Sequence, residues 1–143
     1  MDIIIGSDHA GFDMKMECKS YLEGASEHKI ADIGVYNHDS SDYPKVGQAV
    51  ARAVAAGEYQ RGILICGSGI GMSIVANRFK GIRAALCHNL YLARMSRLHN
   101  DANILVMGGR VIGVGLALEM VDIFLNTAFE GGRHQIRLDM IDC

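Results

Sequence analysis

The chain has 143 residues, of which 50% are apolar and 21% charged, so we expect one domain spanning residues 1–143 that buries about 70% of its unfolded surface. A net charge of −2 argues against nucleic acid or an anionic membrane as the main partner, and the apolar runs are shorter than the roughly 20 residues of a membrane span. The opening residues MDIIIGSDHAGF lack the basic segment of a signal peptide, which indicates a cytoplasmic protein.

The first half of the chain alternates between short β-branched runs and stretches whose apolar residues recur with helical spacing. Pro44 suits the first turn of a helix, where its missing N–H is not needed. In chain order, the pattern predicts a strand at 2–6, a helix at 12–23, a strand at 29–34, a helix at 43–56 and a strand at 62–66.

The second half continues this alternation up to a tail at residues 128–143 that includes the glycine-punctuated sequence EGGRHQIRLDMIDC. In chain order, the pattern predicts a helix at 70–79, a strand at 82–87, a helix at 90–98, a strand at 103–107 and a helix at 114–127.

Five strands that alternate with five helices predict an α/β fold, a three-layer Rossmann-like sandwich whose five-stranded parallel sheet has the order 2-1-3-4-5. Continuous apolar strands suit a sheet that helices cover on both faces. The ligand of such a sheet binds outside the carboxyl ends of the strands, here at the switch point between the first and third strands. Asp8 and His9 follow the first strand and residues 66–71 follow the third, so we expect an Asp, a His and a Cys at one crevice.

Residues 62–79, GILICGSGIGMSIVANRF, carry closely spaced glycines between a strand and a helix. A dinucleotide fingerprint would have its third glycine one position after Gly71, a Walker loop would have a lysine, and a phosphatase loop would have an arginine where Met72 stands. The turn nevertheless exposes backbone N–H groups at a helix N-terminus, which favours an anion or a developing oxyanion. A tight turn without a ligand is the alternative.

Cysteines stand at four well-separated positions without a CxxC pair, unlike those of disulfide-rich or zinc-ribbon domains. A buried free thiol is the expected state of each one: Cys18, Cys66, Cys87 and Cys143. Cys66 stands apart because it lies at a helix start, where the pKa of a thiol falls from its free value of about 8.5. It is therefore a candidate base or nucleophile, with a small buried residue that ends a strand as the alternative.

Arginines gather near the end of the chain, where Arg133 and Arg137 flank His134, and Arg110 follows the fifth strand. A charge cluster usually forms a solvated face, but arginines in a slightly acidic chain, near an anion-favouring turn, suggest recognition of a phosphate. The histidines show no spacing typical of metal ligands, so we expect no metal site.

Five motifs occur in order along the chain: GSDHAGF, the DYP of residues 42–44, GILICGSGIGMSIVANRFKGIRAALC, the SRLHNDANIL of residues 96–105, and EGGRHQIR. Together they closely resemble the type B ribose-5-phosphate isomerases, a family shared with the subunits of galactose-6-phosphate isomerase. The resemblance covers essentially the whole chain. It implies a Rossmann-like sandwich that works as a dimer or larger oligomer, without a metal or nucleotide cofactor.

The activity that the resemblance implies is the interconversion of ribose 5-phosphate and ribulose 5-phosphate through a cis-enediolate, a step of the pentose phosphate pathway. A six-carbon phosphate, such as allose 6-phosphate or galactose 6-phosphate, remains an alternative substrate. A non-catalytic sugar-phosphate-binding module is a further alternative, against which the joint presence of Cys66, Ser68 and His99 speaks.

The resemblance also implies a role for individual residues. Cys66 would remove the proton from C2 and return it to C1, Ser68 would help to move a proton between the two oxygens, and His99 would open the furanose ring. One branch of the family has a Glu base at the position of Met72, so this chain falls in the cysteine branch. The enediolate would be bound by the backbone N–H groups of Gly67, Gly69, Ile70 and Gly71. The sugar would be contacted by Asp8, Tyr43 and Asn100. The phosphate would be contacted by His9, Arg110, Arg133 and Arg137.

The predicted helix at 90–98 runs back from the rim that carries the ligand and covers roughly 13 Å. We therefore expect His99 and Asn100 to lie away from the crevice of their own subunit and to complete the site of a neighbouring subunit across a two-fold axis. The tail at 128–143 would contribute to the substrate site or to dimer contacts. Which subunit supplies Arg110, Arg133 and Arg137 is left open.

Overall fold

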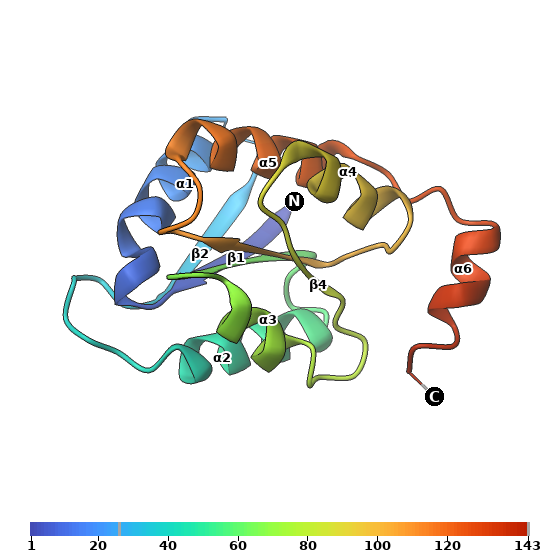
Figure 1. Ribbon diagram of the computed structural model, residues 1–143, viewed down its shortest axis with the longest axis horizontal. Helices are drawn as coiled ribbons and strands as arrows, with labels where there is room; N and C mark the ends of the chain where they lie inside the picture. Colours follow the sequence, from blue (N-terminus) through green and yellow to red (C-terminus); the bar gives the residue numbers. More distant parts are fainter. Residues whose placement is uncertain (26, 143) are drawn as a thin grey trace.

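Five parallel strands form the centre of the computed structural model, which describes residues 1–25 and 27–142 (Figure 1). The strands are β1 (Asp2–Ser7), β2 (Lys29–Gly34), β3 (Arg61–Cys66), β4 (Ala84–Leu86) and β5 (Ile104–Gly108). The helices are η1 (His9–Gly11), α1 (Phe12–Gly24), α2 (Tyr43–Ala55), α3 (Ile70–Ala76), α4 (Leu90–Leu98), α5 (Val114–Asn126) and α6 (Arg133–Leu138). The prediction of a buried free thiol at Cys143 concerns a residue outside these ranges.

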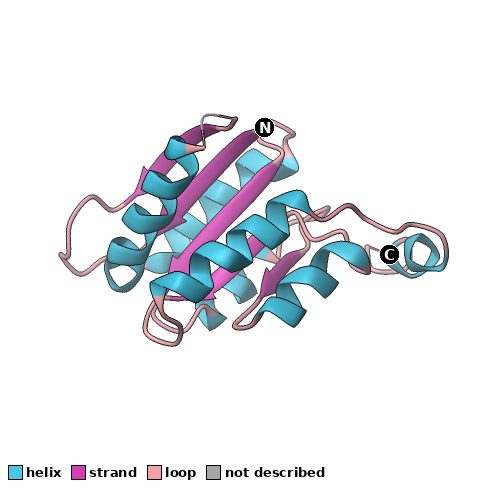
Figure 2. Cartoon of the chain, turned by 90° about the horizontal axis from the view of Figure 1, so that it is seen from above, coloured by secondary structure: helices cyan, strands magenta, loops and turns pink. Residues whose placement is uncertain are grey.

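Helices cover both faces of the sheet, as Figures 1 and 2 show. Alternate strand residues, such as Ile3 and Ile63, pack with α1, α4 and α5 in one core. Their neighbours Ile4 and Leu64 pack with α2 and α3 in a second core. Because β1, β3 and β5 are buried on two faces, their apolar runs are continuous rather than alternating. The predicted α/β sandwich with a five-stranded parallel sheet is confirmed.

The predicted order of the last two strands is wrong, because the sheet runs β2-β1-β3-β5-β4. All five residues of β5 are buried, whereas β4 has three residues that are only half-buried. A strand that is apolar on both faces gains most from the interior of a sheet, so β5 pairs with β3 and β4 takes the edge. The swap brings the segment after β5 beside the end of β3, where the Gly109 N–H donates to the Cys66 carbonyl over 2.8 Å.

Asn77 protects the outer edge of β4. Its side-chain amide donates to the Ala84 carbonyl and its side-chain oxygen accepts from the Ala84 N–H, both over 2.9 Å. Asn77 is the C-cap of α3, so the helix ends at Ala76 rather than at residue 79 as predicted. The side chain thus satisfies backbone groups that an exposed edge strand would offer to another chain.

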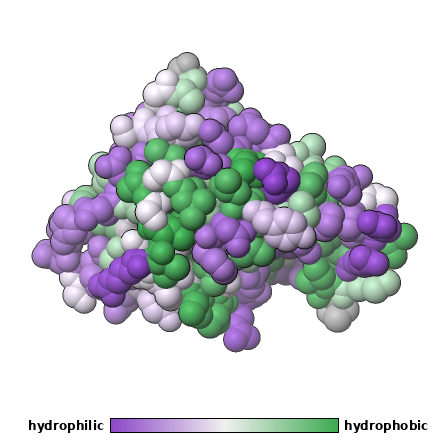
Figure 3. Space-filling view, turned by 45° about the horizontal axis from the view of Figure 1, so that its top comes forward, coloured by the Kyte–Doolittle hydropathy of each residue, from purple (hydrophilic) through white to green (hydrophobic). Residues whose placement is uncertain are grey.

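The tail contains a short helix, α6, that the apolar pattern did not predict. Gly131 and Gly132, with φ of 70° and 57°, separate it from the preceding segment, and it projects from the body of the molecule (right of Figure 1). Ile136 and Met140 are exposed there, and Figure 3 shows apolar surface on this side of the molecule. Six residues are too few for a helical periodicity to stand out. None of the helices in the described ranges is long and apolar enough to cross a membrane.

Candidate active site

A sharp turn at Gly69 joins β3 to α3. Gly69 is the N-cap of α3 and has φ +82°, a left-handed conformation that favours glycine. A Cβ at this position would also lie 2.5 Å from Leu86 Cδ1 and 3.0 Å from the Met107 carbonyl carbon. The residue is therefore glycine for two independent reasons, and its backbone N–H is turned toward the end of β3.

Cys66 ends β3, and its Sγ accepts a hydrogen bond of 3.2 Å from the Gly69 N–H. The N–H at the N-cap of α3 thus points at the sulfur at the end of β3. Cys18 and Cys87 differ because they lie in the core between the sheet and α1, α4 and α5. Burial, reinforced by the negative charge of Glu17, raises the pKa of the Cys18 thiol to about 12. Burial also raises the pKa of the Cys87 thiol to about 11, against a hydrogen bond with Ser96 that lowers it.

Ser68 is exposed within the glycine turn, and its Oγ accepts from the Ile70 N–H over 3.2 Å. Because the hydroxyl oxygen holds this acceptor bond, its hydrogen remains available to donate to a ligand. Gly71 lies against the Tyr43 ring, since a Cβ on Gly71 would be 2.5 Å from two ring carbons. Tyr43 thus packs against the glycine turn and lines the same cleft.

These residues line a cleft of about 610 Å³, a typical size for a small-molecule site. The residues that line it are Asp8, Tyr43, Cys66, Gly67, Ser68, Ile70, Gly71, Ile74, Arg110 and Val111. Eight of these ten were singled out from the sequence, whereas Ile74 and Val111 were not. Isolated apolar residues carry no chemical signal, so the pattern could not single out those two. Gly69 lies behind the lining and reaches it through its bond to Cys66.

Arg110 enters this cleft from its own chain because β5 is adjacent to β3. Its backbone N–H donates to the Gly67 carbonyl over 3.0 Å, and its guanidinium approaches Gly67, where a Cβ would lie 3.5 Å from Nη1. Arg110 therefore lines the cleft of its own chain.

Asp8 lines the cleft from the end of β1, whereas the next residue, His9, is not among the residues that line it. Asp8 is buried, and its Oδ1 accepts from the Gly11 N–H over 3.0 Å, which caps η1. The Ser41 N–H donates to His9 Nδ1, and the His9 N–H donates to Ser41 Oγ, each over 3.2 Å. With Nδ1 acting as an acceptor, the neutral ring of His9 carries its proton on Nε2 and can donate from there.

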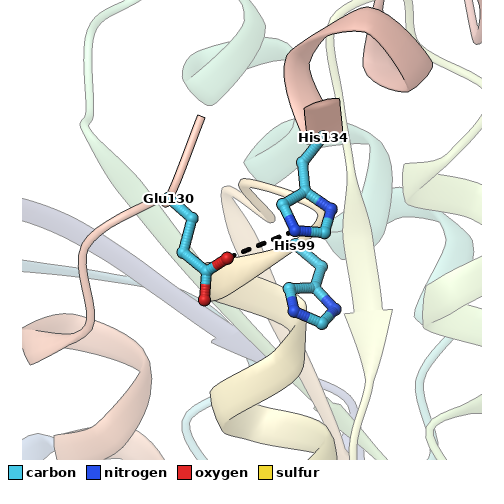
Figure 4. Close-up of side chains that lie close together, drawn as sticks. All are labelled: His99, Glu130 and His134. Atoms are coloured by element: carbon cyan, nitrogen blue, oxygen red, sulfur yellow. Dashed lines mark ion pairs between the residues drawn. The ribbon is translucent and has the colours of Figure 1, made fainter. Parts of the chain in front are cut away.

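Two other predicted residues lie elsewhere. His99 stacks on His134, with ring centroids 4.1 Å apart and an interplanar angle of 14°, next to Glu130 (Figure 4). Asn100 lines a separate cleft of about 240 Å³ with residues such as Arg83. Within the described ranges, neither residue lines the cleft that holds Cys66.

Arg133 and Arg137 are exposed on α6 and also do not line the Cys66 cleft of this chain. The structure thus brings Asp8, Tyr43 and Arg110 to Cys66, and leaves the predicted contacts from α4 and α6 outside.

His99, Glu130 and His134 have ligand-type atoms within 4.8 Å of one another, a grouping that the sequence analysis did not anticipate. The lone pair of an imidazole nitrogen lies in the plane of its ring, so two nearly parallel rings do not direct their lone pairs at one ion. As they stand, these side chains form a stack with an ion pair rather than a tetrahedral metal centre. In the sequence, this grouping was indicated by the spacing of four residues between Glu130 and His134. Gly131 and Gly132 lie between the two, so the spacing does not read as one helical turn.

Sugar-phosphate isomerases are among the known proteins that this chain resembles in sequence and fold. The family described as Ribose/Galactose Isomerase matches residues 3–141. The chain is 47% identical to Ribose-5-phosphate isomerase B of Escherichia coli (strain K12), over 97% of this chain and 93% of that protein. It is 51% identical to the solved ribose-5-phosphate isomerase B of Clostridium thermocellum, with a TM-score of 0.97 over 99% of this chain and 95% of that one. For a ribose 5-phosphate isomerase of Thermotoga maritima the identity is 50% and the TM-score 0.96, over 99% and 97% of the two chains.

Proposed function

The chain belongs to the ribose/galactose isomerase family, and from this we propose that it is an aldose–ketose isomerase that interconverts ribose 5-phosphate and ribulose 5-phosphate. We take residues 1–143 as one isomerase domain. One observation carries the proposal at the level of chemistry: the Cys66 sulfur lines the large cleft and accepts a backbone hydrogen bond at the start of α3. A thiolate held in this way is a base suited to a carbon-bound proton.

We propose that Cys66 removes the proton from C2 of the open-chain aldose and returns it to C1. The intermediate is a cis-enediolate whose negative charge develops on the substrate oxygens. Gly67, Ile70 and Gly71 border the cleft. The backbone N–H groups of Gly67 and Gly71 would stabilise that charge, where fixed donors contribute most, and the Ile70 N–H would join them by leaving Ser68 Oγ, to which it donates in this structure. Ser68, whose oxygen already accepts from Ile70, supplies the hydroxyl that passes a proton between O1 and O2.

The phosphate would be bound by positive and donating groups around the rim. Arg110 borders the cleft, and Nε2 of His9 is left free by the bond that holds its Nδ1. Arg133 and Arg137 would reach the phosphate from the α6 of a second subunit. Arginine suits this role because its planar donors pair with two oxygens at once.

A homodimer or a dimer of dimers, with sites shared between subunits, is part of the proposal. Ile70, Ile74 and Val111 are 54%, 55% and 60% exposed around the cleft, and α6 presents Ile136 and Met140 to solvent. A second copy related by a two-fold axis would cover these apolar side chains. The same docking would bring His99 and Asn100 of the second copy to the first copy's cleft.

A cytoplasmic location is proposed as well. The described cysteines, Cys18, Cys66 and Cys87, are free and buried. Free thiols and a thiol base suit a reducing compartment.

The test of the proposed function is an isomerase assay on ribose 5-phosphate, with allose 6-phosphate and galactose 6-phosphate in parallel. We expect the wild type to turn over the pentose phosphate faster, because one more carbon would have to fit between Cys66 and the arginines. Cys66→Ala should lower kcat by about 10²–10⁴-fold while it leaves substrate binding intact. The isosteric Cys66→Ser is the matched variant, because it keeps the volume but replaces the thiol with a far weaker acid.

Other results would point to the alternatives. Faster turnover of a hexose phosphate would assign the chain to the six-carbon substrate. Binding of ribose 5-phosphate without exchange of its C2 proton for solvent deuterium would make the protein a binding module. Near wild-type turnover by Cys66→Ala would show that the base is another group.

A further inference from the structure

His134 is turned inward although it stands between two exposed arginines. Its side chain is 7% exposed, and its ring lies 4.1 Å from the ring of His99 at an angle of 14° (Figure 4). Gly132, with φ of 57° and ψ of −126°, lies just before α6 in a conformation that favours glycine. α6 thus carries a side chain that packs at the end of α4, besides the exposed Arg133 and Arg137.

Glu130 contacts both His134 and the end of α4 that carries His99. Its Oε2 lies 3.2 Å from His134 Nε2, and its backbone N–H donates to the Leu98 carbonyl over 3.1 Å. The carboxylate therefore contacts the ring of His134, while the backbone of the same residue is fixed to the position just before His99.

The end of α4 is itself held firmly. His99 is the C-cap of α4, and its backbone N–H donates to the Met95 carbonyl over 2.9 Å. Arg97 is buried, donates from Nε to the Thr127 carbonyl over 3.2 Å, and donates from Nη1 to Asp101 Oδ1 over 2.8 Å. Asp101 has φ of +44°, an uncommon conformation that these bonds hold in place. With the backbone fixed, the remaining freedom of His99 is the rotation of its ring.

Opening a furanose ring makes strict demands on that ring. The C1–O4 bond breaks, O1 loses its proton and O4 gains one, so C1 becomes an aldehyde with no net change in protons. A single imidazole can serve both oxygens only if its nitrogen edge points at them, within hydrogen-bond reach. A flat ring packed against one face of His99 limits its rotation and leaves the nitrogen edge open.

We propose that Glu130 and His134 are positioning residues that hold His99 in the orientation needed to open the sugar ring. This inference rests on the proposed function, because His99 would act in the site of a neighbouring subunit. Glu130 restricts the ring of His134 through the contact of its Oε2, 3.2 Å from Nε2, a buried atom that has no hydrogen-bond partner in the described residues. His134 in turn restricts the ring of His99 by stacking.

The two sugars of the reaction allow ring opening to be measured apart from the rest. Ribose 5-phosphate is a furanose and must be opened before C2 can be deprotonated. Ribulose 5-phosphate is open-chain, because its O5 is esterified and cannot close a five-membered ring. Solvent exchange of its C1 proton in D₂O, followed by NMR at early times, therefore reports the enediolate step without ring opening.

Glu130→Gln and His134→Ala should impair only the cyclic substrate. Complete loss of an acid–base group costs about 10²–10⁴-fold, so loss of its orientation should lower kcat on ribose 5-phosphate by about 10-fold. The KM and the exchange rate of ribulose 5-phosphate should stay within about 2-fold, since the arginines and Cys66 are unchanged. His134→Phe keeps a flat ring against His99, so its kcat on ribose 5-phosphate should fall less than that of His134→Ala. Glu119→Gln, on an exposed part of α5, is the control and should behave as the wild type.

A double-mutant cycle tests whether Glu130 acts through His99. If it does, Glu130→Gln should have no further effect in a His99→Asn background, whereas an independent role would make the two losses multiply. The proposal is overturned if the variants keep wild-type kcat on ribose 5-phosphate. It is also overturned if this kcat and the exchange rate of ribulose 5-phosphate fall by the same factor in variants whose melting curves match the wild type. A wild type that turns over neither sugar would overturn the proposed function itself, and this inference with it.

Discussion

Three cysteines of one chain show how much the surroundings decide the chemistry of a single side chain. Cys18 and Cys87 are 0% and 1% exposed, and burial raises the pKa of their thiols to about 12 and about 11. Cys66 is 5% exposed but borders the cleft and faces a backbone donor. The first two thiols stay protonated near neutral pH and act as small apolar residues, which leaves Cys66 as the described thiol that is placed for catalysis.

The raised pKa of Cys18 predicts how stability depends on pH. The unfolded chain loses the Cys18 proton above its ordinary pKa of 9.0, while the folded chain keeps the proton up to about 12. The unfolded state therefore binds fewer protons in this window, so the free energy of unfolding falls as the pH rises above 9. The loss from this residue approaches about 1.4 kcal/mol per pH unit at most.

Urea unfolding at pH 8, 9 and 10 measures this effect, with Cys18→Ala as the comparison. Lysines and tyrosines titrate in the same range, so the informative quantity is the difference between the two slopes. We expect the free energy of unfolding to fall less steeply with pH in Cys18→Ala than in the wild type. Equal slopes would mean that Cys18 ionises alike in the folded and unfolded chains.

At the scale of elements, the turn from β3 to α3 is the feature on which the site depends. Gly69 supplies the donor to Cys66, and its left-handed backbone also packs against Leu86 and Met107. We predict that Gly69→Ala destabilises the fold by about 1–3 kcal/mol through backbone strain, with the steric clash adding to this. A shift of the turn by about 1 Å should also lower kcat by about 100-fold.

Gly57→Ala is the matched control. Gly57 has φ of +77°, close to that of Gly69, but a Cβ there would meet no heavy atom of the described chain within 4 Å. It should show the backbone strain alone and retain full activity. Chemical denaturation and the isomerase assay measure both variants. If the two substitutions cost the same stability and activity, the close packing around Gly69 would have no role.

Local patterns predicted the elements well, because apolar periodicity is a property of neighbouring residues. They predicted the order of β4 and β5 wrongly, because order depends on how much each strand can bury against distant helices. With the order predicted wrongly, the sequence did not explain that Arg110, which follows β5, shares a cleft with Cys66 at the end of the adjacent β3. The stack of His134 on His99 was also beyond local reasoning, because it depends on the backbone conformation of Gly132, which no periodicity records.

At the scale of the whole molecule, the chain divides its predicted catalytic residues between two places. Cys66 and Ser68 border one cleft, while His99 lies with His134 at the C-terminal end of α4. If a second copy supplies the missing half, each dimer contains two complete sites, and each site draws on both chains. A monomer would then contain the part of the site that holds the catalytic base, but it would lack the group that opens the sugar ring.

Mixing two inactive variants tests this division directly. Cys66→Ala and His99→Asn homodimers should each be nearly inactive on ribose 5-phosphate. After subunit exchange by brief unfolding and refolding, half of the dimers are mixed, and each mixed dimer has one site with both residues intact. We therefore expect about a quarter of the wild-type activity to return. A mixture of Cys66→Ala with Cys66→Ser should stay inactive. If the first mixture also stays inactive although mass measurements show mixed dimers, Cys66 and His99 of the same chain must serve one site, and the shared-site arrangement is wrong.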